Sequence, residues 1–270
     1  MPQALPSAIL SSDPAKLLKT VLASALRLTV VGIDEMKSNP IRPAAEITSI
    51  EVRGAWMRAL RKAFAKHCRD ASAPDRIYVW GGTPGYDEKK KQGSPDGIKE
   101  WKRWEFMYDV AVVKAILIDA AYAKDGPEPK QLPIVERAIW LVESEISENG
   151  TEVAIDSSKL RIGRSDHKLF IAKRTNQHDP QKWLEFLGKA LQDIDGDVFL
   201  ALIPSYASRS RGATDWPNGN VELLLYRCAA DGTCPREIAR VSQASPDTTS
   251  GDLQLSGIGL PNRRGDLIRG

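Results

Sequence analysis

Residues 134–146 read IVERAIWLVESEI, an apolar stretch that is dense in Ile, Val and Trp and that ends in two carboxylates. This composition is typical of a central strand buried on both faces. Because side chains alternate along a strand, Glu143 and Glu145 are expected on one face, with Ser144 opposite. Ionised carboxylates in apolar surroundings are unfavourable unless cations or hydrogen-bond donors meet them. The stretch therefore predicts an α/β fold in which one buried strand, 136–147, presents acidic side chains.

A third acidic residue, Asp109, lies within another apolar stretch, FMYDVAVV (106–113), which we interpret as part of a strand over 104–113. If this strand neighbours strand 136–147, Asp109 joins Glu143 and Glu145. Three such carboxylates repel one another, and a divalent metal ion is the usual way to make the arrangement tolerable. The alternatives are a carboxylate paired with a nearby Arg or Lys, and an edge strand with solvated acids.

Further elements are predicted on both sides of these strands. A helix over 46–69 has an apolar stripe, with Arg53 and other basic residues mostly away from it. The other expected elements are a helix over 13–31, a strand over 77–80, a helix over 149–164, a strand over 167–173, a helix over 180–194 and strands over 197–203 and 221–227. From residue 46 the order is helix, three strands, helix, strand, helix, strand. We expect a helical extension over 1–45, an α/β domain over 46–228 and an irregular tail over 229–270.

The composition of the chain excludes few classes of function. The 270-residue chain has a net charge of +3, which argues neither for nor against nucleic acid. Its three cysteines, Cys68, Cys228 and Cys234, are too few for a disulfide framework and indicate a reducing compartment, although Cys228 and Cys234 could pair or share a metal. We find no signal-peptide pattern and no apolar stretch long enough for a membrane span, so a cytoplasmic location without membrane contact is expected.

Four segments together resemble the core of the PD-(D/E)XK nuclease superfamily, over about residues 46–173. They are WEFMYDVAVV (104–113), AIWLVESEI (138–146), the helix containing DSSKL (156–160) and the strand HKLFIAK (167–173). The resemblance implies a restriction-endonuclease-like core, with a central mixed β-sheet flanked by helices in the order α-β-β-β-α-β. The remaining helix and strands are then C-terminal additions.

The resemblance also implies roles for individual residues. Asp109 and Glu143 would hold Mg²⁺, or Mn²⁺ as a substitute, together with a backbone carbonyl near Ser144. Glu145 stands where lysine is usual, which is a departure, although some restriction endonucleases of the superfamily carry Glu-x-Glu. In this interpretation Glu145 accepts the proton of the attacking water, and Lys159 supplies the missing basic group from the following helix. Glu51 matches the place of an additional metal-binding acid.

The predicted activity is Mg²⁺-dependent phosphodiester hydrolysis of nucleic acid, most simply by a DNA endonuclease of restriction or DNA-processing type. The partner would be double-stranded DNA, and cutting both strands would favour a homodimer. Two alternatives stay open: a protein of this fold that binds without cleaving, and a metal hydrolase with another substrate. Candidate phosphate contacts lie in the loop 86–103, which could equally be a solvated loop, and after strand 197–203; they are Lys89, Lys90, Lys91, Lys102, Arg103, Arg209 and Arg211.

Overall fold

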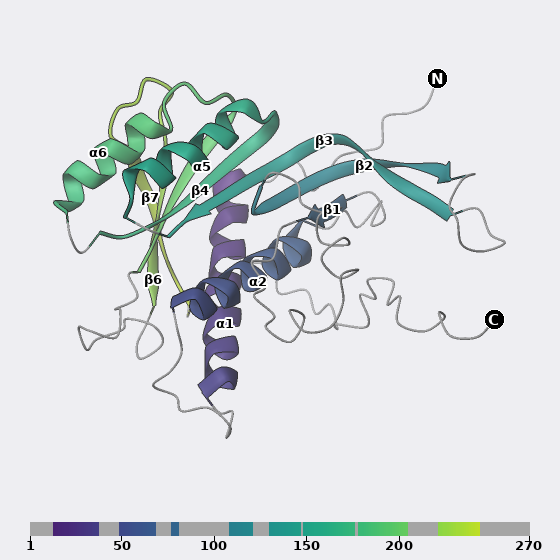
Figure 1. The fold of residues 1–270 in the computed structure, drawn as a ribbon, viewed down its shortest axis with the longest axis horizontal. Coiled ribbons are helices and arrows are strands. Elements are labelled where there is room, and N and C mark those ends of the chain that lie inside the picture. The colour runs from purple at the N-terminus through teal and green to yellow at the C-terminus, as the bar shows by residue number, and fades with distance from the viewer. Residues whose placement is uncertain are drawn as a thin grey trace.

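The computed structural model describes residues 13–37, 49–68, 77–80, 108–120, 130–146, 148–175, 178–204 and 221–243. Within these residues the chain forms four helices and seven strands (Figure 1). In chain order they are α1 (Pro14–Lys37), α2 (Ser49–His67), β1 (Ile77–Trp80), β2 (Val110–Ala120), β3 (Lys130–Glu145), α5 (Gly150–Ile162), β4 (Ser165–Lys173), α6 (Pro180–Ala190), β5 (Asp197–Ile203), β6 (Glu222–Arg227) and β7 (Arg236–Ser242).

All seven strands form one open mixed sheet, in which spatial order follows chain order from β1 to β7. The pairs β1–β2 and β2–β3 are antiparallel, β3–β4 and β4–β5 are parallel, and β5–β6 and β6–β7 are antiparallel. Helices α5 and α6 make the crossovers that two parallel pairs require. The predicted α/β class and the order of helix, three strands, helix, strand are therefore confirmed.

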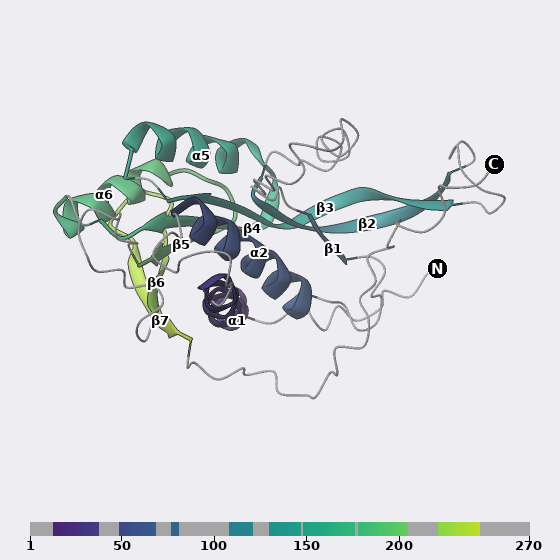
Figure 2. The same cartoon turned by 60° about the horizontal axis from the view of Figure 1, so that its bottom comes forward.

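The helices cover both faces of the sheet. Figure 2 shows α1 and α2 on one face and α5 and α6 on the other. One hydrophobic core lies on the α1 and α2 side and includes Trp56 and Trp140, while the other lies on the α5 and α6 side and includes Leu160 and Phe170. Leu22 of α1 is part of the first core, so this helix packs on the sheet together with α2.

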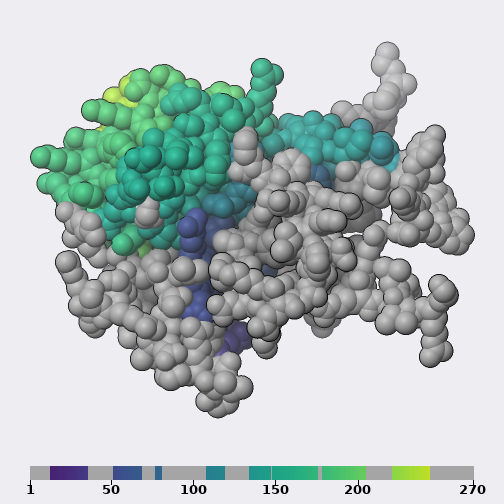
Figure 3. Space-filling view, in the orientation of Figure 1, coloured from purple at the N-terminus to yellow at the C-terminus, as the bar shows by residue number. Residues whose placement is uncertain are grey.

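Two strands differ from their predicted bounds. β2 begins at Val110, so Asp109 precedes the strand instead of lying within it, and the predicted start over 104–107 lies outside the described residues. β3 begins at Lys130. Within residues 134–146 the side chains of 134–138 are exposed or half-buried and burial begins at Ile139, so the prediction of burial throughout 134–146 was wrong. The reason is visible in Figure 1, where the second half of β2 and the first half of β3 extend beyond the other strands as a two-stranded ribbon; in Figure 3 this region is coloured teal.

The tail prediction was wrong in part. β7 (Arg236–Ser242) lies within the segment expected to be irregular, and it pairs with β6 at the edge of the sheet. Residues 244–270 lie outside the described residues.

Two further expectations concern thiols and membranes. Cys68, Cys228 and Cys234 are all free thiols, and burial raises the pKa of Cys68 and of Cys228 to about 12. Among the described residues, no helix combines the length and the apolar character that crossing a membrane requires.

Candidate functional site

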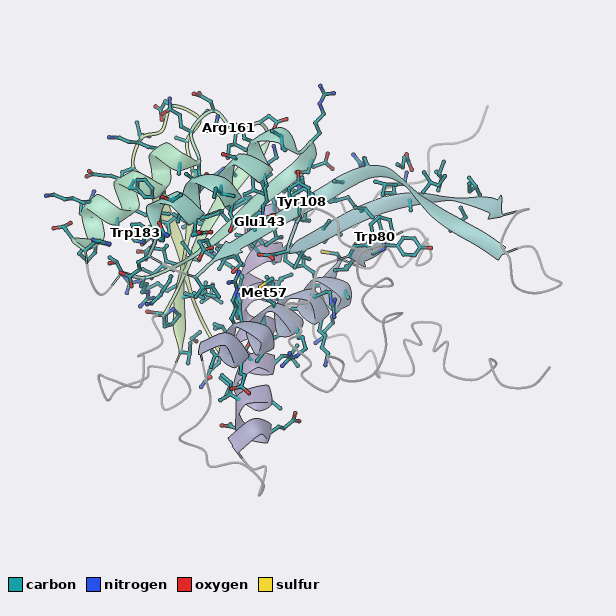
Figure 4. The ribbon with its side chains drawn as sticks, viewed as in Figure 1. Met57, Trp80, Tyr108, Glu143, Arg161 and Trp183 are labelled. Carbon is teal, nitrogen blue, oxygen red and sulfur yellow. The ribbon has the colours of Figure 1, made fainter. Side chains whose placement is uncertain are left out.

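Glu143 lies on the sheet beneath helix α5, almost completely removed from solvent. Its neighbour in register on β4 is Phe170, and Ala172 holds the same relation to Glu145. Both β4 residues belong to the core on the α5 and α6 side. The two glutamates therefore share the face that strand alternation predicted. Figure 4 shows Glu143 on this face, close to the labelled Tyr108.

The ammonium of Lys159 approaches Glu143 from helix α5. Lys159 Nζ lies 3.2 Å from Glu143 Oε2, and the glutamate side chain is only 1% exposed. The other carboxylate oxygen, Glu143 Oε1, is buried and has no hydrogen-bond partner among the described residues. A buried acceptor left without a donor is unfavourable, and a bound ion or water molecule is one way to satisfy it.

Asp109 reaches the same end of β3 from the start of β2. Val110 pairs with Val142, so Ser144 lies just beyond the last paired residues of these two strands. There Asp109 Oδ2 accepts a hydrogen bond from the Ser144 amide at 2.8 Å. Arg53 Nη2 of α2 donates to the Ser144 carbonyl at 3.4 Å. A carboxylate and a guanidinium thus take over the hydrogen bonds that a continued β2 would have made.

Lys159 has a second carboxylate partner, Asp156, one turn earlier on α5. The distance from Lys159 Nζ to Asp156 Oδ1 is 2.7 Å. The helix itself begins at a capping interaction in which the Asn149 side chain accepts from Thr151 N. Tyr108 secures its other end by donating to the Lys159 carbonyl at 3.1 Å. Lys159 therefore bridges two carboxylates from a helix that is fixed at both ends.

Burial dominates the electrostatics of the two sheet carboxylates. It raises the pKa of Glu143 to about 8, the neighbouring charge of Asp109 acts in the same direction, and Lys159 only partly opposes them. Burial also raises the pKa of Asp109, against the opposing effects of the Ser144 amide and the Arg53 charge. Burial disfavours the Lys159 ammonium, but Asp156 and Glu143 outweigh it and raise its pKa. Near neutral pH burial therefore favours the protonated form of Glu143.

Comparison with protein-family models, with curated proteins and with solved structures finds no significant match to this chain. The resemblance to the PD-(D/E)XK superfamily stays a prediction from the sequence.

The predicted metal ligands are only partly brought together. Within the described parts of the chain, no three acidic, His or Cys side chains are grouped closely enough to hold one metal ion. Glu51 lies half-buried on α2, and Glu145 is buried at the end of β3. Neither of them therefore completes a three-ligand cluster with Asp109 and Glu143.

Two carboxylates still fit Mg²⁺, because this ion commonly uses one or two protein carboxylates and takes its other ligands from water and substrate phosphate. The observation that favours such a site is Glu143 Oε1, a buried oxygen that no donor in the described part of the chain reaches. Asp109, whose Oδ2 accepts from the Ser144 amide and whose charge raises the pKa of Glu143, supplies the second carboxylate. The Ser144 carbonyl fits less well than the sequence suggested, since Arg53 already donates to it.

Two residues of the site were missed by the sequence analysis. Asp156 had no predicted role, although its spacing of three residues from Lys159 indicates a shared helix face. Arg53 was expected to lie mostly away from the core, yet it is half-buried and its charge acts on Asp109. The predicted phosphate contacts Lys89, Lys90, Lys91, Lys102, Arg103, Arg209 and Arg211 all lie outside the described residues.

Proposed function

We propose that this chain is a Mg²⁺-dependent phosphodiesterase that cleaves nucleic acid, a DNA endonuclease of the PD-(D/E)XK type acting on double-stranded DNA. The observation that carries the proposal is the approach of Lys159 Nζ to within 3.2 Å of Glu143 Oε2, with Asp109 beside the same strand end. Two carboxylates and one ammonium, brought together from the residue before β2, from β3 and from α5, are the groups that metal-assisted phosphodiester hydrolysis needs.

Each residue has a defined task in this proposal. Asp109 and Glu143 would hold the metal ion. When bound, that ion would lower the pKa of a water molecule and neutralise charge on the scissile phosphate. Glu145, two residues further along β3 on the same face, would take the proton that the water loses. Lys159 would place its positive charge beside the phosphate oxygens as negative charge develops on them.

A second candidate is a protein of this fold that binds nucleic acid without cleaving it. Its support is that the carboxylates are already met by cations of the protein, Glu143 by Lys159 and Asp109 through the charge of Arg53. In that case the acids and bases would stabilise the sheet end and perform no chemistry.

Cleavage assays on purified full-length chain separate the two candidates. Supercoiled plasmid, linear DNA and RNA would be incubated with Mg²⁺, with Mn²⁺ or with EDTA, using wild type, Asp109→Asn and Glu143→Gln. The matched control is Glu136→Gln, because Glu136 is an exposed carboxylate on the same strand that pairs with Lys114 at 3.0 Å.

We expect metal-dependent cleavage by wild type and by the control, with a loss of roughly 100-fold or more in the two site variants. Cleavage that survives in either site variant overturns the assignment. Nucleic-acid binding by wild type without any cleavage favours the second candidate.

A further inference from the structure

The Lys159 ammonium is held by two carboxylates that differ in their surroundings. Glu143 Oε2 is 3.2 Å away on a side chain that is 1% exposed, whereas Asp156 Oδ1 is 2.7 Å away on a side chain that is 13% exposed. The shorter contact is to the more exposed acid, which lies on the same helix as the lysine. The contact between Lys159 and Asp156 lies within α5, so it does not depend on β3.

A divalent cation on Glu143 would meet this ammonium at the carboxylate. The metal ion would bind through Oε1, the oxygen that Lys159 leaves open, and the repulsion between two cations on one carboxylate opposes simultaneous contact with Glu143. The lysine side chain is 32% exposed, so it has room to withdraw toward solvent. Asp156 supplies an acceptor to which the withdrawn ammonium stays attached.

We propose that Lys159 is a displaceable cation on Glu143, and that Asp156 is the positioning residue that retains the ammonium beside the site when a metal ion takes its place. The inference rests on the proposed function, since it assumes a metal ion at Glu143. Asp156 acts through Lys159 and touches neither metal nor substrate. Its effect on metal affinity should therefore depend on the presence of the lysine.

Calorimetric titration with Mn²⁺ alone measures this competition without any reaction. Lys159→Met should bind Mn²⁺ roughly tenfold more tightly than wild type, because it removes the competing cation. Lys189→Met, which removes an exposed positive charge from α6, is the matched control and should leave the affinity unchanged. Asp156→Asn should weaken Mn²⁺ binding several-fold, because Lys159 then rests on Glu143 alone.

The double variant Lys159→Met/Asp156→Asn separates positioning from simple loss of negative charge. If Asp156 acts through Lys159, Asp156→Asn has much less effect on Mn²⁺ affinity in the Lys159→Met background than in wild type. An effect of equal size in both backgrounds overturns the positioning role, and equal affinity of wild type and Lys159→Met overturns the competition. Thermal melts of each variant identify any that fail to fold.

Glu143→Gln in the same titration tests the proposed function separately. Mn²⁺ binding that depends on Glu143 but is unchanged by Lys159→Met defeats only the inference. Absence of Mn²⁺ binding in every folded variant, or binding unaffected by Glu143→Gln, defeats the metal site itself.

Discussion

Replacing Glu143 with Gln should make the metal-free protein more stable at alkaline pH. The carboxyl group has an ordinary pKa of 4.5, and in the folded protein burial and the charge of Asp109 raise it to about 8. Between these two values the folded state keeps a proton that the unfolded state has lost. The contribution of Glu143 to stability is therefore intact below about pH 4.5 and declines as the pH rises toward 8.

The size of the effect follows from the shift. A difference from 4.5 to about 8 corresponds to roughly 5 kcal/mol of lost stability across that interval, an upper estimate because water entry and local relaxation reduce the cost of ionising a buried carboxyl group. Gln keeps the shape and an oxygen acceptor for Lys159, but it never ionises. Near pH 5 the free energy of unfolding of the variant should match that of wild type within about 1 kcal/mol. Near pH 8.5 the variant should be more stable than wild type by a few kcal/mol.

Urea denaturation followed by tryptophan fluorescence, in EDTA at several pH values from 5 to 8.5, measures this difference. Glu136→Gln, on the same strand but exposed, should show almost no pH-dependent difference from wild type. Two results would refute the reasoning. One is a difference in the free energy of unfolding between Glu143→Gln and wild type that stays constant with pH, and the other is a variant less stable than wild type at pH 8.5. Either result would mean that Lys159 compensates the buried charge fully.

Two further predictions concern packing and an ion pair between a buried lysine and an exposed aspartate. Gly163→Ala would place a methyl group on the Tyr108 hydroxyl, so we expect a loss of about 1–3 kcal/mol in urea denaturation, whereas Gly32→Ala, with open space around it, should be neutral or slightly stabilising. Lys168 is fully buried and paired with Asp195. Asp195→Asn should therefore destabilise the folded protein by about 2 kcal/mol in the same assay, while Lys168→Met should be close to neutral. The opposite ranking of the two variants would contradict this interpretation of the pair.

The face shared by Glu143 and Glu145 was predictable because strand alternation is a property of the backbone. The position of Lys159 on the following helix was also predicted, and its ammonium does reach Glu143. Alternation says nothing about where a strand begins, however. Tyr108 and Asp109 are flanked by apolar residues that favour a strand, yet the strand starts after them.

Other parts of the site depend on tertiary packing that local patterns do not encode. Arg53 falls outside the apolar stripe of α2, but the length of its side chain allows it to reach the Ser144 carbonyl. Asp156 has the spacing of an ordinary surface ion pair with Lys159, and only the position of β3 makes that pair part of a site. β7 escaped prediction because REIARVS carries charged residues along an edge strand, without the alternation that marks a buried face.

The most direct test of the central claim, that Asp109 and Glu143 form a divalent-cation site, is anomalous X-ray scattering from crystals of the full-length chain soaked in Mn²⁺. We predict one strong anomalous peak within coordination distance of a carboxylate oxygen of Asp109 and of Glu143, and no such peak in Glu143→Gln crystals treated in the same way. Full Mn²⁺ soaking with no peak between these two residues, or an undiminished peak in the Glu143→Gln protein, would contradict the claim.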